Sequence, residues 1–232
     1  MSSHLKTTAI GLACLVCSAA HANLITNGSF ESGTFVPQGS QTMTLSPGAS
    51  NIAGWQIVND SLAWIGVGDP WGLDAQDGSF FLDLSDYAAG PPFSGLQQTL
   101  TTTPGHEYTV EFYLGSSNRW GRPSAVTVSA AGQSATFTSP TTGTNNDWQL
   151  SSFVFVANAS TTPLTFIGSK GANYIGLDNV SATATAVPEP LSVALLLAGG
   201  AVLAVCTTTG PRPKKCHTRP SAASRGWAET TA

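Results

Sequence analysis

The stretch that decides the fold class is Glu107-Tyr-Thr-Val-Glu-Phe-Tyr-Leu114, in which apolar and polar residues alternate. Because successive side chains of a strand point to opposite faces, we expect one face of this stretch to be apolar. That face would carry Tyr108, Val110, Phe112 and Leu114. The turn signal Thr103-Pro-Gly105 comes just before it. The pattern predicts a half-buried β-strand.

Further short runs of the same kind follow along the chain, bounded by Gly, Pro, Asn and Ser. They cover residues 79–84, 125–129, 152–157, 164–167 and 174–180. No window between the two ends of the chain has an apolar stripe of helical period. We therefore predict an all-β domain, an antiparallel β-sandwich or jelly roll, over residues 23–186. Residues 33–54 are interpreted as one long polar loop that wraps a sheet edge or borders a binding face.

Charge is scarce and unevenly distributed. Only 9% of the residues are charged, against about 25% in an average soluble protein. The net charge of the whole chain is −4, but residues 23–186 hold eleven acidic and three basic residues, which gives this segment −8. An acidic domain of this kind cannot neutralise a run of phosphates, so nucleic acid is excluded as its partner.

The N-terminal residues 1–22 are typical of a signal peptide. Lys6 precedes an apolar run at residues 9–17, and the small residues Ala20 and Ala22 follow at the spacing that a signal peptidase requires. Cleavage after Ala22 would leave Asn23 as the first residue of the exported protein. We therefore predict export, with signal peptidase as a processing partner.

The C-terminal residues are typical of a membrane anchor. Apolar and small residues extend from Leu191 to Cys206, and Thr207–Thr209 could lengthen the segment. We predict one transmembrane helix over about 191–209. Three basic residues follow it, namely Arg212, Lys214 and Lys215. They act as a stop-transfer signal that keeps this end cytoplasmic and places residues 23–186 outside.

The tripeptide Pro188-Glu189-Pro190 stands directly before that helix. The order of tripeptide, apolar helix and basic cluster resembles the PEP-CTERM sorting domain of Gram-negative bacteria. The resemblance implies that residues 187–215 are a sorting segment that an exosortase cleaves at the tripeptide, releasing the protein to the cell surface. The chain departs from that pattern in its seventeen-residue polar tail, residues 216–232. An ordinary permanent anchor is the alternative.

Seven motifs within residues 23–183 occur in an order that resembles the bacterial choice-of-anchor C proteins, which are related to a plant cell-wall family of unknown function. The motifs are Asn23-Leu-Ile-Thr-Asn-Gly-Ser-Phe-Glu-Ser-Gly33, Ile52-Ala-Gly-Trp55, Ala63-Trp-Ile-Gly66, Asp77-Gly-Ser79 with Leu82-Asp-Leu84, Pro104 with Tyr108, Trp148, and Leu177-Asp-Asn-Val180. The resemblance implies a galactose-binding-like jelly-roll fold. Function does not follow from it, because this fold hosts glycan binding, adhesion and purely structural roles.

Glu31 and Asp178 lie in the first and the last of these motifs. In glycan-binding modules that resemble this chain, the corresponding residues hold a structural Ca²⁺ that ties the two termini together. Carried over, the resemblance nominates Glu31 and Asp178 as calcium ligands, since Ca²⁺ prefers carboxylate and carbonyl oxygens. The alternative is that the two carboxylates bond nearby backbone amides at strand ends.

Two tryptophans are candidates for binding a glycan, because sugar rings stack on exposed aromatic faces. Trp71 and Trp120 lie in segments rich in Gly and Pro, where an indole is more readily displayed than in a strand. Arg119 stands beside Trp120 and would supply hydrogen-bond donors. The alternative is that both indoles fill loops.

Catalytic motifs are not evident between residues 23 and 186. This segment has one histidine, His106, no cysteine and no Gly-x-Ser-x-Gly motif. We therefore predict a non-enzymatic protein of the extracellular matrix or exopolysaccharide layer that binds glycan and is displayed on the surface of a Gram-negative bacterium, anchored in the inner membrane before processing. The alternatives are a permanently anchored structural or adhesive matrix protein without a small ligand, and a glycoside hydrolase, which would need two opposed carboxylates.

Overall fold

A computed structural model describes residues 22–68, 70, 72–88, 90–116, 123–139, 147–170 and 174–185. All of them belong to the first of two compact units, Met1–Ala186. The described residues form eleven strands and no helix. Accordingly, this part of the chain offers no helix long and apolar enough to cross a membrane. The predicted signal peptide before residue 22, the sorting segment and the C-terminal helix lie outside the described residues.

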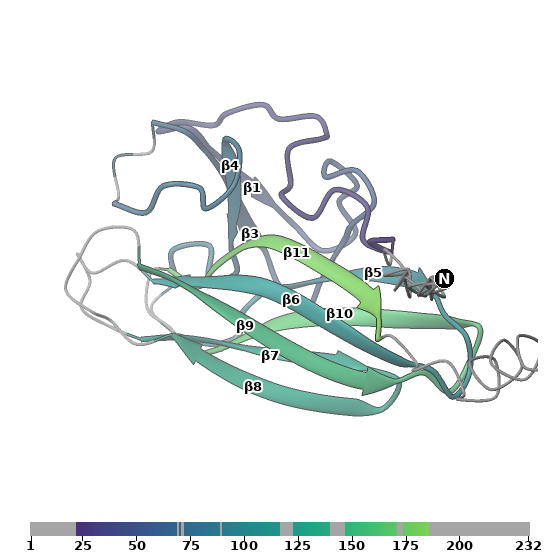
Figure 1. The fold of residues 1–232 in the computed structure, drawn as a ribbon. Coiled ribbons are helices and arrows are strands. Elements are labelled where there is room, and N and C mark those ends of the chain that lie inside the picture. Colours follow the sequence, from purple (N-terminus) through teal and green to yellow (C-terminus); the bar gives the residue numbers. More distant parts are fainter. Residues whose placement is uncertain are drawn as a thin grey trace, which may run out of the picture. The chain divides into compact units, whose positions relative to one another are not determined.

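The strands make two antiparallel sheets, which appear as two layers in Figure 1. The six-stranded sheet has the order β1 (Thr42–Leu45), β3 (Leu62–Gly66), β4 (Phe80–Asp83), β11 (Gly176–Ala184), β6 (Glu107–Ser116) and β9 (Asp147–Val156). The five-stranded sheet has the order β2 (Gln56–Val58), β5 (Gly95–Thr101), β10 (Thr161–Lys170), β7 (Ser124–Ala130) and β8 (Gln133–Ser139). Every pairing between neighbouring strands is antiparallel.

The main core lies between the two sheets. Strand β6 directs Val110, Phe112 and Leu114 into it, and all three are fully buried, as the alternation of residues 107–114 predicts. The Phe112 ring lies 5.3 Å from the Phe137 ring and 5.2 Å from the Phe166 ring, both of which belong to the opposite sheet. The predicted all-β antiparallel sandwich is therefore confirmed.

The long polar loop predicted over residues 33–54 is wrong in part, because the structure forms strand β1 within it. Thr42↔Ile65 and Leu45↔Leu62 are the outer pairs of its ladder with β3. Met43 and Leu45 are buried, while Thr44 between them is exposed. The four residues alternate like a strand, but the run is too short to stand out among its polar neighbours.

A smaller core covers the outer face of the six-stranded sheet where β3 and β4 pair. It contains Ala63 and Ile65 from β3, Phe81 from β4, and Leu73 and Tyr174 from connecting segments. Strand β3 is consequently buried on both faces, with all five of its residues below the surface.

The first described residues are tied to the last strand. The Leu24 amide donates to the Ala182 carbonyl at 2.8 Å, and the Ala182 amide donates to the Asn23 side-chain oxygen at 2.9 Å. The Val180 amide donates to the Gly28 carbonyl at 3.0 Å. Gly28 must be glycine, because a Cβ there would lie 1.9 Å from the Val180 carbonyl oxygen. These contacts place the beginning and the end of the domain side by side.

Candidate functional site

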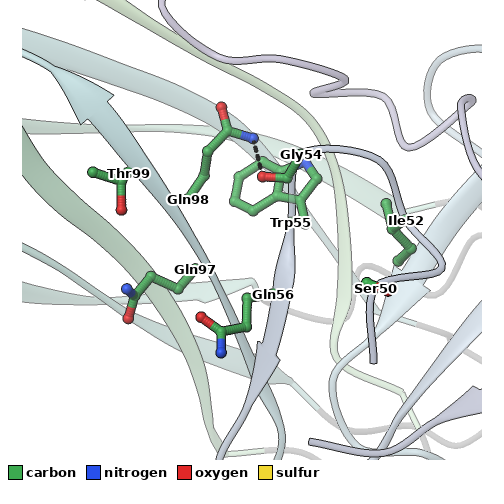
Figure 2. Close-up of a pocket in the computed structure, with 8 residues that line it drawn as sticks. All are labelled: Ser50, Ile52, Gly54, Trp55, Gln56, Gln97, Gln98 and Thr99. Carbon is green, nitrogen blue, oxygen red and sulfur yellow. Dashed lines mark hydrogen bonds between the residues drawn. The ribbon is translucent and has the colours of Figure 1, made fainter. Parts of the chain in front are cut away.

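A hollow of about 350 Å³ opens where the short strand β2 meets the middle of β5. Its walls come from the segment before β2, from β2 and from β5, and Figure 2 shows the side chains. The lining residues are Ser50, Ile52, Gly54, Trp55, Gln56, Gln97, Gln98 and Thr99. Strand β2 pairs with β5 only along residues 95–97. On that side, Gln98 and Thr99 therefore adjoin the segment before β2, which lines the hollow with them. Ser50, Ile52 and Gly54 belong to the segment that was predicted to wrap a sheet edge or border a binding face.

Two amide side chains stand next to each other on the outer face. Gln56 of β2 and Gln97 of β5 are direct partners in the ladder, so their side chains leave the sheet on the same side. In Figure 2 both amides point away from Gln98. Gln56 is exposed and Gln97 is half-buried. Each side-chain amide offers donors and an acceptor to a polar ligand.

Gln98 points the other way and fixes the wall of the hollow. Its Nε2 donates to the carbonyls of Thr26 and Gly54, both at 2.9 Å, and its Oε1 accepts from the Thr26 amide at 2.8 Å. This side chain is 7% exposed. A buried amide with three bonds to two different segments is a rigid brace, so the segment carrying Gly54 is held against β5.

Trp55 forms the floor of the hollow. Its Nε1 donates to the Asn27 carbonyl at 2.9 Å, and its ring packs against Phe30 and Phe166 with centroids 5.6 and 6.4 Å apart. The side chain is only 4% exposed, so the indole supports the site from below and does not present a face for stacking. The hollow thus offers amides and hydroxyls above an aromatic floor.

None of the eight lining residues carries a charge. This favours a ligand without ionised groups, since burying an unpaired charge against such a surface is costly. Hydroxyl groups suit the site, because the amides of Gln56 and Gln97 and the Thr99 hydroxyl can each donate and accept. The arrangement is suited to binding and contains no acid or base for catalysis.

Glu31 and Asp178, the predicted calcium ligands, both contact the segment of residues 76–80. Glu31 Oε1 accepts from the amides of Ser79 and Phe80 at 2.8 and 2.7 Å. Asp178 Oδ2 accepts from the amides of Gln76 and Asp77 at 2.8 and 3.0 Å.

These contacts are the ones that the alternative interpretation, bonding to backbone amides, describes. Asp178 Oδ1 also accepts from the Asn179 amide at 2.7 Å, so both of its oxygens are engaged. Across the described ranges, no group of three or more His, Cys, Asp or Glu side chains could hold a metal ion. Calcium binding by Glu31 and Asp178 stays a prediction.

Two carboxyl groups are completely buried in the six-stranded sheet. Burial raises the pKa of Asp178 from 3.8 to about 7, although three backbone amides act in the opposite direction. Burial likewise raises the pKa of Asp83 to about 6, against hydrogen bonds from Ile175, Ser85 and Tyr87. Both carboxyls hold local backbone segments in place and lie outside the hollow.

The predicted glycan-binding residues Trp71, Trp120 and Arg119 lie outside the described residues, as do Ala20, Pro188, Glu189, Pro190, Arg212, Lys214 and Lys215. Ala22 is described and exposed. The sequence interpretation did not nominate Gln56, Gln97 or Thr99. One signal was available in the run Leu96-Gln-Gln-Thr-Leu100, where three uncharged polar residues stand between two leucines.

A family model described as "Protein of unknown function (DUF642)" matches residues 23–175. Among curated proteins, halomucin of Haloquadratum walsbyi is 30% identical over 176 residues, which is 74% of this chain. The matched segment spans only 2% of the length of halomucin.

Several solved structures are similar at low identity. They include the CBM22-1 xylan-binding domain of Paenibacillus barcinonensis Xyn10C, with 14% identity and a TM-score of 0.45 over 74% of this chain and 100% of that one. A family 35 carbohydrate binding module from Clostridium thermocellum has 11% identity and a TM-score of 0.43 over 62% and 99%. At these values the likeness says nothing about a ligand for this chain.

Proposed function

The chain belongs to the DUF642 family of proteins of unknown function, and we propose that its β-sandwich binds an uncharged polysaccharide in the hollow between β2 and β5. The pair Gln56 and Gln97 carries this proposal, because two adjacent amides without a neighbouring charge match the hydroxyl groups of a neutral sugar. The brace made by Gln98 supports it, since a preformed site loses less entropy when the ligand binds.

The proposed action is binding without catalysis. A glycoside hydrolase needs two carboxyl groups on opposite sides of the scissile bond. The hollow is lined by no carboxyl group, and the buried carboxyls of Asp83 and Asp178 accept hydrogen bonds from backbone amides. These observations favour a binding module within the described part of the chain.

The site of action in this proposal is the cell surface or the surrounding polysaccharide layer of a Gram-negative bacterium. The support comes from the sequence alone: residues 1–22 are typical of a signal peptide, and residues 187–215 resemble an exosortase sorting segment. Signal peptidase and exosortase would be the processing enzymes. Mass spectrometry of the mature protein tests this, because an intact tail through Ala232 would contradict exosortase cleavage and favour a permanent anchor.

The binding proposal is tested by affinity gel electrophoresis of the exported domain. The gels would contain the neutral polymers mixed-linkage β-glucan, xylan, galactomannan or dextran, or the acidic polymers alginate or polygalacturonate. We expect at least one neutral polymer to retard the domain and the acidic ones to have no effect. Retardation by none of the neutral polymers would refute the proposal.

Two variants locate the site on the structure. We expect Gln97→Ala to weaken retention by about tenfold, which corresponds to one or two lost hydrogen bonds of about 1 kcal/mol each. Gln149→Ala is the matched control, because Gln149 is an exposed amide on β9 of the other sheet. Equal retention of the two variants would place the ligand elsewhere.

Adhesion is a second candidate, and the exposed apolar side chains of the edge strand β9 favour it. Leu150, Val154 and Val156 are 52%, 48% and 43% exposed. Edge strands with apolar side chains tend to pair with another chain. Analytical ultracentrifugation of Val154→Lys against the unaltered domain tests this candidate: concentration-dependent association that the lysine abolishes would support it, and a monomer in both cases would exclude it.

A further inference from the structure

A second hollow of about 540 Å³ lies on the same sheet, around the turn between β7 and β8. Ser129, Gln133, Ser134, Asn158 and Pro163 contribute side chains to it. None of these side chains is charged. The composition of this hollow resembles that of the first.

The two hollows adjoin each other across the middle of the sheet. Thr99 of β5 lines the first hollow and Pro163 of β10 lines the second. These two residues are direct partners in the antiparallel ladder, and both are exposed. The linings of the two hollows therefore meet at the pair Thr99 and Pro163.

A row of polar side chains runs alongside this junction at right angles to the strands. Its members are successive ladder partners, one from each strand: Gln56, Gln97, Thr165, Ser129 and Ser134. Direct partners point to the same face, so all five side chains share the outer surface. Within the row, the Thr165 hydroxyl donates to Gln97 Oε1 at 3.4 Å. Neighbouring members are separated by one interstrand spacing of about 4.8 Å.

The surroundings of the row also lack charge. The parallel row two residues along the strands contains Ile167, Thr127 and Thr136, and the last two share a hydrogen bond of 2.9 Å between their hydroxyls. Lys170 is the sole charged residue in the five strands of this sheet. It stands at the end of β10.

From this row and the two hollows at its ends, we propose that the ligand is an extended neutral polysaccharide, bound along its length, whose chain crosses the five strands from Gln56 to Ser134. This inference rests on the proposed function and adds the direction and the length of the bound segment. One sugar unit is about as long as one interstrand spacing of ~4.8 Å, so the row accommodates four or five units.

Titration calorimetry with a ladder of oligosaccharides tests the length. The probes are the two- to six-unit oligosaccharides of whichever neutral polymer retards the domain in the gel. We expect the affinity to rise with each added unit up to four or five units, by at least tenfold in total, and then to level off. An affinity that is already constant from two units onward would overturn the inference, since a single hollow would then hold the whole ligand.

Two substitutions test the path. We expect Thr165→Glu, in the centre of the row, to weaken binding of the five-unit probe by tenfold or more. Ser134→Glu, at the far end, should weaken the five-unit probe but leave the two-unit probe unchanged. Thr109→Glu is the matched control, because Thr109 lies on the outer face of β6 in the other sheet. Unchanged binding of the five-unit probe by the Thr165 and Ser134 variants would refute the path.

The two proposals fail in different ways. If no neutral polymer retards the domain, the proposed function is wrong. If a polymer retards it but the affinity does not grow with length, only the extended path is wrong. Melting temperatures of the three glutamate variants, compared with that of the unaltered domain, verify that each variant is folded.

Discussion

The two sheets of the sandwich differ in the number of acidic residues that their strands contain. The strands of the six-stranded sheet contain five acidic residues, namely Asp83, Glu107, Glu111, Asp147 and Asp178, whereas those of the five-stranded sheet contain none. The two buried acids, Asp83 and Asp178, hold connecting segments through backbone amides. One sheet thus organises its loops with carboxylates, and the other offers a neutral surface of hydroxyls and amides.

Asp83 shows how the first sheet works. Its Oδ1 accepts from the amides of Ser85 and Ile175 at 2.9 and 2.7 Å, and its Oδ2 accepts from the Tyr87 amide at 3.1 Å. The segment after β4 and the one before β11 are therefore fixed by a single side chain. The five-stranded sheet does the corresponding work without charge, through the buried amide of Gln98, which holds Thr26 and Gly54.

The largest effect is expected from removing that carboxylate. Asp83→Ala leaves three backbone amides, two of them buried, without their acceptor, and we expect the free energy of unfolding to fall by about 4 kcal/mol. Urea denaturation measures it. The matched control is Glu111→Ala, an exposed acid on β6 whose removal should change stability by less than about 0.5 kcal/mol. Similar losses in both variants would mean that burial does not set the role of these acids.

The next effect is a dependence of stability on pH. The pKa of Asp83 is about 6 in the folded chain and near 3.9 when unfolded, so the folded state keeps a proton that the unfolded state releases. The contribution is complete below about pH 4 and is lost as the pH rises towards 7, by about 3 kcal/mol for this residue. Asp178, with a pKa of about 7, acts in the same direction.

Thermal melts of the domain of residues 23–186 between pH 4 and pH 8 measure this dependence. We expect a lower melting temperature at pH 8 than at pH 5, and a flatter profile for Asp83→Asn. A melting temperature that rises steadily over this range would contradict the raised pKa values. The five-stranded sheet should contribute nothing to the profile, since its strands contain no carboxyl or histidine side chain.

A smaller effect is expected from the brace in the neutral sheet. Gln98→Ala removes two donated bonds and one accepted bond, and we expect a loss of about 2 kcal/mol in unfolding free energy. Polysaccharide retention should fall as well, because the wall carrying Gly54 is released. Retention that stays unchanged while stability falls would show that the wall is not part of the site.

The smallest effect is expected from salt. If the neutral sheet binds the ligand, raising NaCl from 50 mM to 1 M should change the affinity less than about twofold, because screening acts on charged groups only. Calorimetry with the five-unit probe measures this. A tenfold loss of affinity in high salt would indicate a charged ligand and would remove the distinction between the two sheets.

The alternation of Tyr108, Val110 and Phe112 was sufficient to predict the fold class, because a period of two over eight residues indicates a half-buried β-strand. Strand β1 was missed since only two of its residues, Met43 and Leu45, are apolar. The position of β2 beside β5 could not be predicted at all. Residues 56 and 97 are far apart in the sequence, and pairing over such a separation depends on the whole sandwich.

The candidate site illustrates the same limit. Sequence interpretation selected aromatic residues in loops, because indole faces are the familiar platform for sugars. Gln97 and Gln98 are adjacent residues of the same type. Gln97 nevertheless reaches the outer surface, whereas Gln98 holds Thr26 and Gly54 by hydrogen bonds. Only the register of β5 distinguishes their roles, and three consecutive polar residues between Leu96 and Leu100 leave that register open.

The bonds between Asn23, Leu24 and Ala182 have a consequence for engineering and for evolution. A domain whose ends meet can be inserted into a longer polypeptide without stretching it, and its ends can be joined by a short linker. We expect a circular permutant that is opened at the Ala131–Gly132 turn and closed between residues 185 and 23 to fold with the same two sheets. The same closeness of the two ends would allow the domain to be inserted as a unit into other proteins.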